Sequence, residues 1–382
     1  MDVRSLLRRF DYLLLVTTLG LVTYGVLMVH AATEHDIRGE PWHWAFRQLV
    51  YAAVGMVVMV VLAIFDYERL RRWQWVLYGF ALASIALVFA VGPVTRGSRR
   101  WIPLGVIDFQ PSELAIFIIC VALGAFLVDR LDARESWRLT CLALAYLLLP
   151  CLLVFLQPDL GTATVIGAMG LGLLFLFGTS WRHFLAMGVA GAIAVVLVLQ
   201  VLPLFGLRVV KDYQLARLTV FVDKNADPAS AGYNVRQAMI AVGSGGLTGR
   251  GEEATQTQLA FLPEHHTDFI FAVVGERWGF LGAVGLLALY ALFLWRALRA
   301  AALARDMYGS VMAGAIATVV LYQVLVNMGM SLGIMPVTGI PLPFVSYGGA
   351  AMITNLMLVG LLQSIHIRGS EALAMRTRVA VQ

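Results

Sequence analysis

Uninterrupted apolar runs constrain this chain more than any other feature. Tracts rich in Leu, Val, Ala and Phe recur from residue 12 to residue 366. Each is about as long as the roughly 20 helical residues that cross a hydrocarbon core about 30 Å thick. Only 13% of the residues are charged, against about 25% in soluble domains. The runs do not alternate with polar residues, so helices fit and barrel strands do not. The sequence predicts an all-α polytopic membrane protein.

Ten spans are predicted, and no cleavable signal peptide is expected before the first. We expect them at residues 12–32, 47–65, 74–92, 112–128, 139–156, 163–178, 184–205, 269–295, 310–330 and 350–366. The connection at 206–268 is the longest and is predicted to be an extracytoplasmic loop between the seventh and eighth spans. The whole chain, 1–382, is predicted to be a single integral membrane domain with cytoplasmic tails at 1–11 and 367–382.

Arginine placement sets the predicted orientation. An even number of spans puts both termini on one side, and the tails and loops of that side hold sixteen arginines. The four shorter loops of the other side hold four. Positively charged loops stay in the cytoplasm, so both termini are predicted to be cytoplasmic. The net charge of +5 suits anionic membrane lipids. It does not indicate nucleic acid, because no basic cluster with interleaved aromatics is present.

The stretch FLPEHHTDFIFAVVGERWGF gathers charged groups at the start of the eighth span. Asp268 is either a helix N-cap or a partly buried carboxylate that acts as a general base. Glu276 lies about two turns further on, where a charge is functional by default unless it pairs with another helix. His265 and His266 are adjacent and match no ligand spacing of a metal site, so the metal ligands stay unknown.

Other outer segments carry candidates with two interpretations each. Arg99 and Arg100, beside Trp101, fit phosphate or headgroup binding, or they are snorkelling side chains. Glu113 follows QPS and either serves a helix N-terminus or contributes to a site. Asp159 in QPDLGTA is a turn or cap residue when taken alone.

Two further outer segments are rich in Gly or Pro. GSGGLTGRG, residues 243–251, carries Ser244 and Arg250 and is either a phosphate-binding backbone or a flexible loop. PVTGIPLP cannot form regular helix, so it marks a loop that must be shielded from lipid. Ser346 follows it and is a candidate for substrate binding. Because all these segments fall on the outer side, we expect a single outward-facing site.

Five blocks give the chain a family resemblance: DFQPSELA, QPDLGTA, GYNVRQAMIAVGSGGLTGRG, QTQLAFLPEHHTDFIFAVVGE and GIMPVTGIPLPFVSYGG. In this order they resemble the SEDS family of bacterial cell-wall glycosyltransferases, over nearly the whole chain. The last block is more similar to elongation members than to division members. A sporulation paralogue is not distinguished from an elongation member.

The resemblance implies an activity and a location. SEDS members polymerise lipid II in the bacterial cytoplasmic (inner) membrane. The donor is a glycan on undecaprenyl pyrophosphate, and the acceptor 4-hydroxyl attacks the anomeric carbon with inversion. A divalent cation, Mg²⁺ or Mn²⁺, is implied at the pyrophosphate. The implied partner is a class B penicillin-binding protein, which crosslinks the new glycan.

The resemblance also implies residue roles. Asp268 matches the catalytic carboxylate of the family, and Asp159 matches a position important for activity. Glu113 matches the Glu of the PSE motif. Arg217 in YQLAR and Gln237 in GYNVRQ match polar loop positions. Arg99, Arg100, Ser244, Arg250, Glu276 and Ser346 complete the predicted substrate-binding set.

Three positions depart from the family pattern. Ile116 stands where Lys is frequent, so Glu113 lacks its usual intrahelical partner. Arg277 stands where a second Glu is usual, and a hypothesis is that it supplies the missing cation. His265 replaces a frequent Arg beside Asp268.

Other functions remain open from sequence. A lipid II flippase would need polar groups within the spans, and few are present besides Glu276 and Arg277. A solute transporter would show broken helices with repeat symmetry, which is not evident. A non-catalytic scaffold for a penicillin-binding protein is the third alternative.

Overall fold

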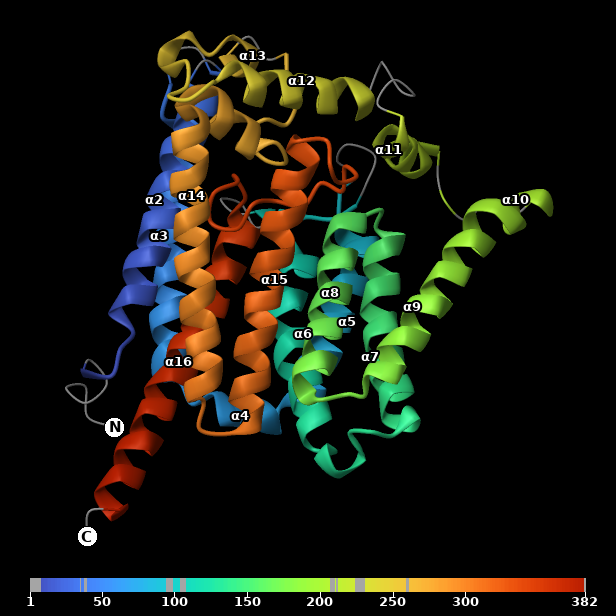
Figure 1. The fold of residues 1–382 in the computed structure, drawn as a ribbon, viewed down its shortest axis with the longest axis vertical. Coiled ribbons are helices and arrows are strands. Elements are labelled where there is room, and N and C mark those ends of the chain that lie inside the picture. The colour runs from blue at the N-terminus through green and yellow to red at the C-terminus, as the bar shows by residue number, and fades with distance from the viewer. Residues whose placement is uncertain are drawn as a thin grey trace.

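The structure, a computed structural model, is a bundle of long helices with a cap of shorter ones (Figure 1). It describes residues 8–34, 36–37, 40–93, 99–103, 108–206, 210, 212–223, 231–258 and 261–380. The predicted loop 206–268 and the two predicted tails therefore lie partly outside the described residues. Nearly all described elements are helical, and the one pair of short strands is β1 (Ile102–Pro103) with antiparallel β2 (Asp108–Phe109).

The described part of the chain contains ten helices long and apolar enough to span a membrane, which confirms the predicted number. They are α2 (Tyr12–Thr33), α3 (His43–Ile64), α5 (Gln74–Val91), α6 (Pro111–Val128), α7 (Trp137–Leu156), α8 (Leu160–Phe177), α9 (Trp181–Val196, extended through a π-turn and α10, Leu202–Leu204), α14 (Ile270–Leu303), α15 (Met307–Ser331) and α16 (Gly349–Ala380). The shorter helices are α4 (Tyr67–Arg72), α11 (Asp212–Val222), α12 (Ala231–Ser244) and α13 (Thr255–Gln258), with single turns at Leu131–Ala133 and Gly251–Glu253.

Helix α2 begins and α16 ends on the same side of the bundle, here called the terminal face (Figure 1). The opposite side, the distal face, carries α11, α12 and α13. Helices α6, α15 and α16 are largely buried and form the centre, whereas the span at α9 has no buried stretch and leans away from the others. The bundle therefore has a protein-packed centre and a periphery that suits contact with lipid.

Local sequence signals set the ends of several spans. The side chains of Asp11 and Asp306 accept hydrogen bonds from the first free backbone N–H groups of α2 and α15, which the helix itself cannot satisfy. Gly178 ends α8 in the left-handed conformation, with φ of 89°, which glycine adopts without steric cost. These caps explain why the apolar runs form separate helices.

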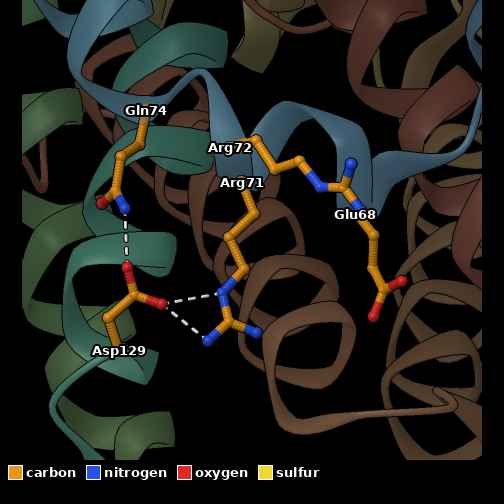
Figure 2. Close-up of a pocket in the computed structure, with 5 residues that line it drawn as sticks. All are labelled: Glu68, Arg71, Arg72, Gln74 and Asp129. Atoms are coloured by element: carbon orange, nitrogen blue, oxygen red, sulfur yellow. Dashed lines mark hydrogen bonds and ion pairs between the residues drawn. The ribbon is translucent and has the colours of Figure 1, made fainter.

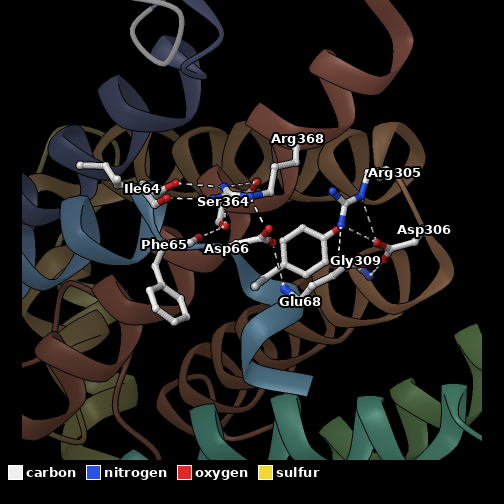
Figure 3. A network of polar contacts seen from close by, with 11 residues as sticks. Ile64, Phe65, Asp66, Glu68, Arg305, Asp306, Gly309, Ser364 and Arg368 are labelled. Atoms are coloured by element: carbon white, nitrogen blue, oxygen red, sulfur yellow. Dashed lines mark hydrogen bonds and ion pairs between the residues drawn. The ribbon is translucent and has the colours of Figure 1, made fainter. Parts of the chain in front are cut away.

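A polar network joins α4, α15 and α16 at the terminal face (Figure 3). The guanidinium of Arg368 donates to the carbonyl of Ile64 at 2.8 Å and pairs with Asp66 at 3.2 Å. Arg305 pairs with Glu68 at 2.8 Å, and Tyr67 donates to Asp306 at 2.9 Å. Each charged group therefore has a partner of opposite sign where the helices leave the apolar region.

Candidate active site

Asp268 lies in a turn on the distal face, just before α14. The turn begins at Glu264, which has a φ of 54°, and the N–H groups of Thr267 and Phe269 both donate to its carbonyl. The N-cap residue of α14 is Phe269, and its side chain makes no capping bond. The side chain of Asp268 is thus not the cap of the eighth span.

Helix α14 is broken at Gly279, where φ is 63° and ψ is −158°. The predicted span at 269–295 is therefore two helices rather than one. The first piece, up to Trp278, is mostly buried and packs beside α12. This break lets the segment after Asp268 stay inside the protein while the second piece continues as the span.

Three consecutive backbone carbonyls hold the turn in place. The carbonyl of His266 accepts from the N–H of Tyr347 at 2.9 Å. That of Thr267 accepts from the hydroxyl of Ser346 at 2.6 Å, and that of Asp268 accepts from the side-chain amide of Asn327 at 2.8 Å. The donors come from α15 and from the loop before α16, so distant segments fix the backbone that carries the carboxylate.

The loop at 332–348 passes directly beside the Asp268 carboxylate. A Cβ built on Gly339 would lie 3.2 Å from Oδ2 of Asp268 and 3.8 Å from Nη1 of Arg217. A Cβ on Gly161, in the first turn of α8, would lie 2.9 Å from the carbonyl oxygen of Thr338. The predicted non-helical Pro-rich loop is thus packed between α8 and the Asp268 turn.

A second carboxylate, that of Asp159, is buried at the N-terminus of α8. It accepts from the backbone N–H of Thr162 at 3.3 Å and from the Thr162 hydroxyl at 3.0 Å. The side-chain amide of Gln110 donates to it at 3.0 Å. Glu113 is also buried, hydrogen-bonds Thr162 and lies within electrostatic reach of Asp159. Asp159 therefore caps a helix and also joins the two outer segments that the sequence singled out.

Arg100 connects this cluster to the strand pair. Its guanidinium pairs with Oδ1 of Asp159 at 3.8 Å and donates to the carbonyls of Gln157, at 3.2 Å, and Pro158. Its neighbour Arg99 is exposed and donates instead to the carbonyl of Phe89 at the end of α5, at 2.9 Å. The two arginines thus differ: one joins the cluster, and the other caps a helix.

Four charges act on the Asp268 carboxyl. Burial raises its pKa to about 6, Glu264 and Asp159 act in the same direction, and Arg217 and Arg100 oppose them. A carboxyl with this pKa is ionised at neutral pH yet remains basic enough to accept a proton. The structure thus brings together Asp268, Asp159, Arg100 and Arg217, with Glu113 next to Asp159.

Three other predicted site residues lie around the α14 break instead. The carbonyl of Glu276 accepts from the N–H of Arg250, and its side chain accepts from the N–H of Gln256, both at 2.8 Å. Arg250 donates to the carbonyl of Ser244 at 3.2 Å. The Gly-rich segment packs on α14, since a Cβ on Gly249 would overlap the carbonyl of Arg277.

Three remaining positions from the sequence analysis, Arg277, His265 and Gln237, lie elsewhere or contact other parts of the protein. Arg277 pairs with Glu34 at 3.2 Å, so it does not supply the cation missing at Ile116. Both ring nitrogens of His265 face backbone carbonyls, those of Leu262 and Ala32. Gln237 lies half-buried in α12.

No cage of metal ligands surrounds Asp268 among the described residues. Among those residues, one group of three His or acidic side chains is close enough together to hold an ion: Asp36, His265 and His266. It does not include Asp268, and both ring nitrogens of His265 already lie against backbone carbonyls. Mg²⁺ usually takes one or two protein carboxylates together with substrate phosphates. Asp268 is half-buried, and one carboxylate of this kind fits such a shared site rather than a complete protein site.

Residues 11–371 match the model of the FtsW/RodA/SpoVE family, described as cell cycle proteins. The chain belongs to this family. It is 40% identical over 357 residues to the peptidoglycan glycosyltransferase MrdB of Escherichia coli, covering 93% of each chain. It is 36% identical over 361 residues to stage V sporulation protein E of Bacillus subtilis, covering 93% of this chain and 96% of that one.

Solved structures show the same fold. A chain described under structural coordination of polymerization and crosslinking by a peptidoglycan synthase complex aligns with a TM-score of 0.78 and 31% identity, over 94% of this chain and 98% of that one. The Thermus thermophilus rod shape determining protein RodA aligns with a TM-score of 0.67 and 30% identity, over 94% and 96%. The family assignment and the polytopic helical fold expected from the sequence are both confirmed.

Proposed function

We propose that this protein is a peptidoglycan glycosyltransferase that polymerises glycan strands during cell elongation and shape maintenance. The donor is a growing glycan on undecaprenyl pyrophosphate, and the acceptor is the 4-hydroxyl of lipid II. The observation that carries this proposal is the Asp268 carboxyl, which has a pKa of about 6 and faces Arg217 across Gly339.

Asp268 acts as the general base. Its carboxylate takes the proton of the acceptor hydroxyl as the oxygen attacks the anomeric carbon from the face opposite the leaving group. The bond between the anomeric carbon and the pyrophosphate oxygen breaks, its electron pair stays on the pyrophosphate, and the configuration inverts. A base whose pKa lies near the working pH is suited to this transfer.

Arg217 and Arg100 stabilise the pyrophosphate as negative charge develops on it. Both already act electrostatically on Asp268, so they lie where the acceptor and the leaving group meet. Charged hydrogen bonds to phosphate are strong when the donor geometry is fixed in advance. Asp159 holds Arg100 at 3.8 Å and thereby orients one of the two cations.

A divalent cation, Mg²⁺ or Mn²⁺, would enter with the pyrophosphate. When bound, it would neutralise part of the leaving-group charge. Asp268 and Glu264 are the carboxylates of the turn that face this region. The Asp159 carboxylate is already surrounded by donors from Thr162, Gln110 and Arg100.

The proposed location is the bacterial cytoplasmic membrane, with both termini in the cytoplasm and the distal face outside. The excess of arginines on the terminal face supports this orientation. A class B penicillin-binding protein is the proposed partner. The similarity to a chain of a peptidoglycan synthase complex that coordinates polymerization and crosslinking supports it.

Polymerisation of lipid II by the purified protein tests the proposal. Glycan chains should form with wild type and should be lost with Asp268→Asn. Asp132→Asn, which changes an exposed acid near the terminal face, is the matched control and should keep full activity. A flippase would move lipid II across vesicles without forming glycan, and a scaffold would do neither, so equal glycan yields from the two variants would refute the assignment.

A further inference from the structure

A polar pocket lies beside α4 (Figure 2). Helix α4 is at the terminal face, opposite the distal face that carries α11, α12 and α13 (Figure 1). The pocket has a volume of about 360 Å³, near the lower end of the roughly 300–1,000 Å³ of small-molecule sites. Charged and amide side chains line it: Glu68, Arg71, Arg72, Gln74 and Asp129. The proposed glycosyl transfer uses none of them.

One half of the pocket is fixed by Asp129, which follows the last turn of α6. Its Oδ1 accepts from Nε of Arg71 at 2.8 Å and from Nη2 at 2.6 Å. Its Oδ2 accepts from the side-chain amide of Gln74 at 2.6 Å (Figure 2). Three elements, α4, α5 and α6, are thus joined by one carboxylate, and the charge of Arg71 is neutralised.

The other half presents one cation and one anion. Arg72 is exposed and has no ion-pair partner among the described residues. Glu68 is also exposed, and its Oε2 pairs with Nη2 of Arg305 at 2.8 Å. The lining holds two guanidinium groups and two carboxylates, and Arg305 behind Glu68 is itself balanced by Asp306, at 3.5 Å. The pocket and its surroundings therefore carry no excess of either sign.

The pocket lies at the depth of lipid headgroups. Gln74 is the first residue of one span, and Asp129 follows the last residue of another. Trp73 and Trp75, the two sequence neighbours of Gln74, are 61% and 56% exposed. Exposed tryptophans beside the ends of apolar helices mark the boundary between hydrocarbon and water.

We propose that this pocket binds the headgroup of an aminophospholipid. The phosphate diester accepts hydrogen bonds from Arg72, and the primary ammonium donates to Glu68. An anionic lipid would supply the phosphate for Arg72 but no cation for Glu68, so a pocket that presents both groups favours a zwitterion. A choline headgroup carries a cation without N–H groups and cannot donate to a carboxylate.

Titration of the delipidated full-length protein with single phospholipids tests this, with native mass spectrometry as the readout. The probes are dioleoyl phosphatidylethanolamine, phosphatidylcholine and phosphatidylglycerol. Ethanolamine lipid should bind most tightly. Arg72→Ala should weaken its binding by about ten-fold, the effect of losing one charged hydrogen bond. Glu68→Gln should weaken the ethanolamine lipid and leave phosphatidylglycerol unchanged or tighter.

Arg69→Ala is the matched control, because Arg69 is an exposed arginine of the same helix that does not line the pocket. It should leave all three affinities unchanged. Equal losses for Arg69→Ala and Arg72→Ala would overturn the proposal in favour of a general basic surface. Preference for phosphatidylglycerol, with no effect of Glu68→Gln on the ethanolamine lipid, would overturn it in favour of a simple anion site. None of these lipid-binding measurements depends on glycosyl transfer.

Discussion

The side-chain amide of Asn327 donates one hydrogen bond to the carbonyl of Asp268 and another to the carbonyl of Ile340, each 2.8 Å long. Asn327 is fully buried in α15. One amide therefore fixes both the turn that carries the proposed base and the loop that passes beside its carboxylate. The position of the carboxylate therefore depends on the packing of α15 as well as on the helix that follows it.

Replacing Asn327 should impair catalysis more than substrate binding. Asn327→Ala leaves two carbonyls without their donor, and a shift of about 1 Å in a catalytic group can lower a rate roughly 100-fold. We expect kcat to fall by about 10- to 100-fold while KM for lipid II changes little. Asn355→Ala is the control, since among the described residues the side-chain amide of Asn355 donates to Ala351 of its own helix. Steady-state kinetics well below both melting temperatures measure the difference, and equal kcat values for the two variants would refute the positioning role.

Gly339 leaves space at the carboxylate that a side chain would fill. Its φ is 74°, and a Cβ there would lie 3.2 Å from Oδ2 of Asp268. Gly339→Ala should abolish polymerisation, because the methyl group takes the approach of the acceptor and strains the backbone. Gly178→Ala carries a similar strain, with φ of 89° and no neighbour within 4 Å. If the two variants lost stability and activity equally in melting and glycan assays, strain alone would explain the effect.

The raised pKa of Asp268 predicts that ionisation of this carboxyl, which the proposed general base requires, lowers the stability of the folded protein. Its folded-state pKa is about 6, against 3.8 in the unfolded chain. The folded protein therefore binds the proton more tightly, and its stability falls as pH rises from about 4 to 6. Above pH 6 the decrease in the free energy of unfolding is complete and amounts to at most about 3 kcal/mol. Asp268→Asn should thus melt at a higher temperature than wild type at pH 8 and at a similar one at pH 4. A lower melting temperature at pH 8 would contradict the burial of this charge.

The same pKa predicts the pH profile of the reaction. A general base must be ionised, so kcat/KM should fall about ten-fold for each pH unit below 6 and level off above it. The pKa of the free carboxyl, 3.8, would instead leave the rate flat down to about pH 4. Initial rates of glycan formation between pH 4.5 and 8 distinguish the two, with melting curves to confirm that the protein stays folded.

The spans could be predicted because the signal for them is local. A run of about 20 apolar residues suffices to place a helix across a membrane, and ends such as Asp11 carry their own caps. The break at Gly279 could not be predicted, because glycine occurs in most of the spans and only packing against Leu247 and Gly249 requires its φ of 63°. For the same reason the contacts of Glu276 with Arg250 and Gln256 at this break could not be predicted.

Part of the site was visible in sequence, and part was not. Asp268 and Asp159 stand out as acids at the ends of apolar runs. Asn327 was missed, although an amide inside an apolar helix is itself a signal of a polar contact within the membrane. Gln110 was also missed, because its hydrogen bond to Asp159 joins two segments 49 residues apart. Thr162 was missed although it lies only three residues after Asp159, within reach of a capping bond.

The two adjacent arginines should differ sharply in their effect on activity. Arg100 makes three contacts with the turn before α8, two with carbonyls and one with Asp159, whereas Arg99 donates to one carbonyl of α5. Arg100→Lys keeps the charge but cannot reach three partners, because a single ammonium lacks the planar fork of a guanidinium. We expect Arg100→Lys to lower kcat/KM for lipid II by about ten-fold or more, the cost of one charged hydrogen bond to phosphate, and Arg99→Lys to have little effect. Kinetics with lipid II as both donor and acceptor measure this. Equal losses at the two positions would mean that the outer loop contributes positive charge alone, without the fixed geometry that Asp159 gives Arg100.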